Sequence, residues 1–152
     1  MMGLFKGNKF KWIRQHDSMQ CGVACLAMIC RHYGKDYSLE YLDSFCHANI
    51  AGVSMLGIAD GARSVGLETM TAAASTYELK EISLPCILHW NQNHFVVLYG
   101  ISGNGRRYRI ADPGKGLVSC TRRELESHWI SSVTDGEPSG VVMQLTPTRD
   151  FH

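Results

Sequence analysis

The chain has 152 residues, of which 45% are hydrophobic and 19% are charged. This length fits one domain with one sizeable core. A formal net charge of +1, with basic and acidic residues interleaved, gives no electrostatic reason to expect nucleic acid or an anionic membrane as a partner. We therefore expect a single domain over residues 1–152, with residues 1 to about 13 loosely ordered.

No segment has the composition of a membrane span or a secretory signal, and the longest apolar runs have the length of core elements. None of the six cysteines forms a Cys-x-x-Cys pair, and three fall within residues 21–30, which argues against a zinc ribbon and a disulfide framework. The glycine-rich segments lack Walker spacing. We expect a reducing, cytoplasmic setting, no metal or cofactor, and most thiols buried as small apolar groups.

The first half of the chain predicts helices. An edge strand at Phe10, Trp12 and Ile13 precedes a helix over about 18–33, with Ser18 as N-cap and Gly34 in the left-handed conformation that ends it. This helix is apolar all round, so we expect the fold to pack around it. Two further helices, each begun by a capping serine, are predicted at 38–48 and 54–65.

After Gly66 the pattern changes to strands rich in β-branched and aromatic residues. The predicted elements are a strand at 67–73, a helical turn at 76–82, strands at 84–90, 94–100 and 106–111, a helix at 121–129 and a strand at 140–145. Helices first and an antiparallel sheet second is the α+β pattern.

The most informative residue is Cys21, which stands where a polar run gives way to the apolar helix. A helix N-terminus presents unpaired N–H groups and a partial positive charge, which stabilise a thiolate over a thiol. A thiol nucleophile also needs a base. His94, at the head of a predicted strand, is the strongest of the seven histidines, and His89 is its rival.

Asp112, at the end of another predicted strand, is the candidate that orients the imidazole, although Asp-Pro-Gly is also a frequent turn sequence. A two-residue turn at Asn104-Gly105 would put Val97 opposite Asp112, on the wrong face for His94. A three-residue loop at 102–104 would put His94 directly opposite Asp112. The catalytic interpretation predicts the second register, or a bulge with the same effect.

Gln15 precedes Cys21 by six residues. Its side-chain amide and the backbone N–H of Cys21 are candidates for an oxyanion hole, which would stabilise a tetrahedral intermediate. Taken alone, a glutamine in a loop is more often simply solvated.

Together these residues resemble the bacteriocin-processing cysteine peptidases, the papain-like domains at the N-terminus of peptidase-containing ABC transporters. One departure is Gln20, because that family usually has an acidic residue just before the cysteine. The residues that carry the resemblance are Gln15-x5-Cys21-Gly22, Tyr33-Gly34, His89-Trp90, Asn93-His94-Phe95-Val96-Val97-Leu98, Ala111-Asp112-Pro113 with Gly116, and the tail from Trp129 through Gly140 to Phe151.

The resemblance implies a papain-like α+β fold, with Cys21 as nucleophile, His94 as base, Asp112 as orienter and Gln15 as oxyanion donor. It also implies a domain at the cytoplasmic face of the bacterial inner membrane that cuts the leader from a precursor peptide after a double-glycine motif. Such leaders bind as amphipathic helices, so an apolar surface groove is expected. The implied partners are the precursor and the transmembrane and ATPase parts of a transporter.

Two alternatives stay open at this point. The first is a module that binds leader peptides without cutting them. The second is another papain-like hydrolase, such as an amidase or an acyltransferase acting on small substrates.

Overall fold

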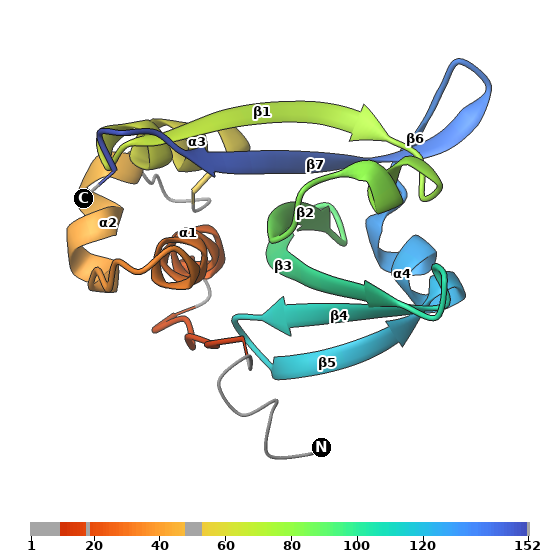
Figure 1. Ribbon diagram of the computed structural model, residues 1–152, viewed down its shortest axis with the longest axis horizontal. Helices are drawn as coiled ribbons and strands as arrows, with labels where there is room; N and C mark the ends of the chain where they lie inside the picture. The colour runs from red at the N-terminus through yellow and green to blue at the C-terminus, as the bar shows by residue number, and fades with distance from the viewer. Residues whose placement is uncertain (1–9, 18, 48–52, 152) are drawn as a thin grey trace.

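Helices and strands are segregated in the computed structural model, which describes residues 10–17, 19–47 and 53–151. Within these residues a seven-stranded antiparallel sheet has the order β1-β7-β2-β3-β4-β5, and β6 pairs with β7. The three N-terminal helices lie on one side of the sheet and α4 on the other (Figure 1). The predicted α+β class is confirmed.

The observed elements agree with the predicted helices and strands to within a few residues. The helices are α1 (Cys21–His32), α2 (Leu39–Cys46), α3 (Met55–Ser64) and α4 (Arg122–Trp129), with a 3₁₀-turn, η2 (Glu78–Glu81). The strands are β1 (Leu67–Ala74), β2 (Cys86–Trp90), β3 (His94–Ser102), β4 (Arg107–Asp112), β5 (Gly116–Thr121), β6 (Ser132–Thr134) and β7 (Glu137–Pro147). None of the helices in the described ranges is long and apolar enough to cross a membrane.

Helix α1 is the centre of the core, as its all-round apolar sequence predicts, because its residues from Cys21 to Cys30 are all buried. Gly34 has φ +99° and ends the helix, and its N–H donates to the Arg31 carbonyl at 3.0 Å. The helix begins later than predicted, at Cys21 with Gln20 as N-cap. The predicted cap, Ser18, lies outside the described residues.

A turn closed by Asp17 delays the start of α1. The Asp17 carboxylate accepts from the Met19 N–H at 2.8 Å, and its carbonyl accepts from the Gln20 N–H at 3.1 Å. Such local bonds compete with helical ones. The first intrahelical bond therefore runs from the Ala24 N–H to the Gln20 carbonyl, at 2.9 Å. Cys21 is thus the first helical residue, at the end where N–H groups have no intrahelical partner.

The predicted edge strand at Phe10, Trp12 and Ile13 is wrong. These residues have no regular secondary structure and pack their side chains against the core around α1 instead. We call residues 10–17 the N-terminal strap. Conversely, the short strands β5 and β6 were not predicted from the sequence. Strand β5 is an edge strand that pairs only with β4, and its side chains are mostly half-buried or exposed, so its apolar signal is weak.

Gly61 allows helix α3 to pack closely against α2. A Cβ placed on Gly61 would lie 2.5 Å from Cys46 Sγ, which is closer than real contacts allow. We expect Gly61→Ala to lower the free energy of unfolding by about 1–3 kcal/mol through overpacking. The loss should shrink in a Cys46→Ala background, since the clashing sulfur is then absent. Urea unfolding of the four proteins checks this, and an equal loss in both backgrounds would contradict it.

Candidate active site

A bulge in β3 decides whether the candidate base and orienter can meet. Near the hairpin, Ser102 is opposite Arg107, which is the register of the two-residue turn. The register then shifts between Leu98 and Gly100, so that Val97 is opposite Ala111. Continued by one residue, this pairing brings Val96, two positions from His94, opposite Asp112. Residues two apart share a face of a strand, so His94 and Asp112 lie on the same face. The predicted alternative of a bulge is confirmed.

His94 and Asp112 are in direct contact across the ends of β3 and β4. His94 Nε2 lies 2.8 Å from Asp112 Oδ1, and the two side chains are 23% and 7% exposed. The same Oδ1 accepts from the Gly114 N–H at 2.9 Å. Asp112 thus acts both as the turn residue that its sequence suggested and as the partner of the imidazole. With Nε2 engaged, Nδ1 is the ring nitrogen left for a second partner.

Cys21 is near enough to this ring to affect its pKa. Burial disfavours the charged imidazole, but hydrogen bonds to Asp112 and Cys21, with the negative charge of both groups, outweigh burial and raise the pKa of His94 to about 9. Burial also opposes ionisation of Asp112, but the His94 and Gly114 bonds and the charges of His94 and Lys115 hold its pKa below the usual value. The site therefore favours an imidazolium between a carboxylate and a sulfur.

Cys21 is held rigidly beside this pair. It is 6% exposed at the first position of α1, and the next residue, Gly22, packs so tightly that an added Cβ would lie 2.8 Å from Ile58 Cδ1 and 3.4 Å from Phe95 Cδ2. Ile58 belongs to α3 and Phe95 to β3, directly after His94. The first turn of α1, which carries Cys21, is therefore packed closely against both α3 and β3.

Gln15 approaches the same site from the N-terminal strap. Its backbone N–H donates to the Pro113 carbonyl at 3.0 Å. A Cβ placed on Gly114 would lie 3.6 Å from both Gln15 Oε1 and Asp112 Oδ1, so the glutamine side chain lies against the turn that holds Asp112. Oε1 is buried and has no hydrogen-bond partner within the described ranges. The four residues singled out from the sequence thus converge from the strap, α1, β3 and β4.

The other thiols and the rival histidine have different surroundings. All six cysteines are free and buried, as expected. Burial raises the pKa of Cys25 well above its usual value, and raises the pKa of the Cys30, Cys46 and Cys86 thiols to about 12. His89 stacks on Phe95 with ring centroids 5.0 Å apart, and burial lowers its pKa. His89 therefore has the environment of a packed side chain rather than of a base paired with a carboxylate.

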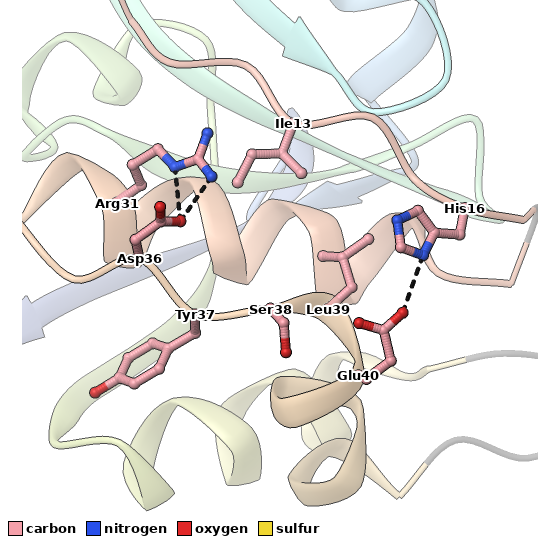
Figure 2. Close-up of a pocket in the computed structure, with 8 residues that line it drawn as sticks. All are labelled: Ile13, His16, Arg31, Asp36, Tyr37, Ser38, Leu39 and Glu40. Carbon is pink, nitrogen blue, oxygen red and sulfur yellow. Dashed lines mark hydrogen bonds and ion pairs between the residues drawn. The ribbon is translucent and has the colours of Figure 1, made fainter.

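A polar hollow of about 370 Å³ lies between the strap, the end of α1 and the start of α2 (Figure 2). Arg31 bonds to Asp36 at 2.6 Å on one side, and His16 Nδ1 lies 3.3 Å from Glu40 on the other. The charged groups at its rim differ from the apolar groove expected for an amphipathic leader. We therefore do not assign it to leader binding.

Comparison with protein-family models gives a match to the peptidase C39 family over residues 9–134. Among curated proteins, the colicin V secretion/processing ATP-binding protein CvaB of Escherichia coli is 34% identical over 139 residues, which are 91% of this chain and 18% of that protein. The lactococcin-G-processing and transport ATP-binding protein LagD of Lactococcus lactis is 34% identical over 125 residues, which are 78% of this chain and 18% of that protein. The chain thus spans about a fifth of the length of these relatives.

Solved structures give the same result for the fold. A double glycine motif protease from an AMS/PCAT transporter, in complex with its leader peptide, has a TM-score of 0.81 and 33% identity, covering 92% of this chain and 93% of its own. The peptidase domain of Streptococcus ComA, a bi-functional ABC transporter, has a TM-score of 0.78 and 26% identity, covering 92% and 100%.

Proposed function

Since the chain belongs to the peptidase C39 family, we propose that it is the part of a longer export protein that cuts leader peptides from their precursors after a double-glycine motif. Family membership makes it a cysteine peptidase with a papain-like fold, as the sequence resemblance implied. The similar solved protease and its bound leader peptide support the substrate class. The longer relatives, named for secretion and ATP binding, support a place beside the transmembrane and ATPase parts of a transporter, at the cytoplasmic face of the inner membrane.

One observation carries the assignment of the catalytic residues. The 2.8 Å contact of His94 with Asp112 stands beside the thiol of Cys21, the first residue of α1. A thiol, an imidazole and a carboxylate in this order are the parts of an activated sulfur nucleophile. Cys21 is the nucleophile, and His94 is the general base and acid. Asp112 orients the imidazole and stabilises its protonated form.

The reaction follows from these positions. The Cys21 thiolate attacks the carbonyl carbon of the second glycine, and the Gln15 amide with the Cys21 N–H stabilises the oxyanion. His94 protonates the leaving amine, which departs as the N-terminus of the mature peptide and leaves a thioester on Cys21. Deprotonated His94 then activates water, which releases the leader and regenerates the thiol. Asp112 keeps Nδ1 of His94 directed at the sulfur throughout.

A cleavage assay tests the substrate class. A precursor with a Gly-Gly leader is incubated with the protein beside a control in which both glycines are replaced by valine, which puts a branched side chain at each position of the motif. We expect one cut, after the second glycine, in the native precursor and none in the control, as read from product masses. An uncut precursor together with hydrolysis of small amides would favour the alternative of an amidase. Binding without any cut would favour a leader-binding module.

A further inference from the structure

The N-terminal strap is fixed to the turn that follows β4 by two hydrogen bonds. Trp12 Nε1 donates to the main-chain oxygen of Asp112 at 2.7 Å, although the two residues are 100 positions apart. The Gln15 N–H donates to the main-chain oxygen of Pro113 at 3.0 Å. In Figure 1 the strap, in red, passes between α1 and the ends of β4 and β5. One turn thus presents the Asp112 carboxylate to His94 and receives the segment that carries Gln15.

The Trp12 ring makes contacts besides the hydrogen bond of its N–H. It is half-buried against the core around α1, and the guanidinium carbon of Arg14 lies 4.9 Å from the ring centroid. An indole has a single donor, so one bond to a carbonyl fixes the direction of the ring. The Asp112 carbonyl that accepts this bond is itself fixed, because it also accepts from the Lys115 N–H at 3.0 Å.

We infer that Trp12 is a positioning residue of this peptidase. Its indole N–H holds the strap against the Asp112 turn and so keeps the Gln15 amide where the oxyanion forms. The inference rests on the proposed function, specifically on the roles given to Gln15 and Asp112. An oxyanion develops only in the transition state, so a displaced donor lowers kcat and leaves KM unchanged.

The test replaces Trp12 by phenylalanine, which keeps an aromatic ring and removes the donor. We expect kcat to fall by about 3- to 10-fold, with KM changed by less than about twofold. Trp129 is the matched control, since its Nε1 donates to the Val141 carbonyl at 2.9 Å on the other side of the sheet. Trp129→Phe removes the same kind of bond and should leave kcat within about twofold of wild type.

A double-mutant cycle separates positioning of Gln15 from a general loss of structure. Gln15→Ala alone should lower kcat by about 10²- to 10³-fold. In that background Trp12→Phe should lower kcat by less than about twofold, because the amide that it positions is gone. The inference is overturned if Trp12→Phe leaves kcat unchanged, if it acts on KM, or if it has the same effect with and without Gln15.

A second substrate distinguishes this inference from the proposed function. Hydrolysis of p-nitrophenyl acetate also passes through an oxyanion, and it needs no double-glycine leader. One outcome is that the precursor stays uncut while the ester assay shows that Trp12→Phe lowers kcat only when Gln15 is present. In that case the substrate class is wrong and the role of Trp12 stands. If the precursor is cut and the cycle is additive, the substrate class stands and the role of Trp12 falls. If wild type hydrolyses neither, both are overturned.

Discussion

Replacing Cys21 by alanine should reduce precursor cleavage by about 10⁴-fold or more, to the level of the buffer, because no other group of the site can form the acyl intermediate. The precursor should still bind with nearly its wild-type affinity, since the substitution removes a single sulfur atom from the protein surface that meets it. Product masses measure cleavage, and fluorescence anisotropy of a labelled precursor measures binding.

Cys25→Ala is the matched control for this variant. Cys25 is one helical turn further along α1 and is fully buried, and its pKa is raised by burial and by the charges of Cys21 and Asp112. The Cys25→Ala variant should keep its cleavage activity but be somewhat less stable, because a small cavity is left in the core. Activity retained by the Cys21 variant, or lost by the Cys25 variant with its fold intact, would exclude Cys21 as the nucleophile.

Asp112→Asn should move the alkaline limit of activity to lower pH. The proposed mechanism requires an imidazolium, and the Asp112 carboxylate is one of the groups that raise the pKa of His94 to about 9. Without this charge we expect the alkaline limb of kcat/KM to shift down by about 1–3 pH units, and kcat/KM at pH 8 to fall by about 2- to 100-fold. The pH profile of kcat/KM for both proteins measures the shift.

The same pair gives stability a pH dependence whose sign can be stated. The pKa of His94 in the folded protein, about 9, lies above its ordinary value of 6.5. The contribution of His94 to the free energy of unfolding is therefore complete below about pH 6.5 and is lost as the pH rises through about 9. Asp112 has a lowered pKa, so its contribution is present above its ordinary pKa and is lost as the pH falls through the lowered value.

Thermal unfolding between pH 6 and 10 checks this contribution. The wild-type Tm should fall through the alkaline range more steeply than that of Asp112→Asn, in which the His94 charge is no longer stabilised. If Tm falls equally with pH in the two proteins, or if the alkaline limb of activity does not move, Asp112 does not raise the pKa of His94.

The parts of the fold that depend on local chemistry could be predicted from the sequence. Serine caps at Ser38 and Ser54 begin α2 and α3 through bonds from Tyr41 and Gly57 N–H groups, both at 3.1 Å. Such bonds join residues three apart, so the sequence shows both partners. The start of α1 was misplaced because Asp17 offers its neighbours alternative bonds, and the sequence alone does not decide that competition.

The register of β3 against β4 shows where prediction reached its limit. Both candidate hairpins were compatible with the residues around Asn104, and only the observed shift between Leu98 and Gly100 joins the turn-proximal register to the contact of His94 with Asp112. A bulge depends on packing from both faces of the sheet, which a local pattern does not contain. Turn propensity thus gave the register next to the hairpin, and the chemistry of the site indicated the shift that places His94 and Asp112 on one face.

Trp12 had no signal of its own in the sequence. It was assigned to an edge strand on apolar character, but its N–H bonds to a carbonyl 100 residues away. Strand β5 was missed for a related reason, since its pairing with β4, from Asp112 opposite Gly116 to Arg107 opposite Thr121, depends on a partner rather than on its own apolar pattern.

Trapping the acyl intermediate tests most directly whether Cys21 cuts the leader from the precursor. The reaction is quenched with acid during turnover, and the protein is digested and sequenced by mass spectrometry. We expect the leader, ending in its second glycine, attached to Cys21 as a thioester that hydroxylamine removes. A leader found on another residue, or turnover with no leader on any cysteine under conditions that preserve thioesters, would contradict the account.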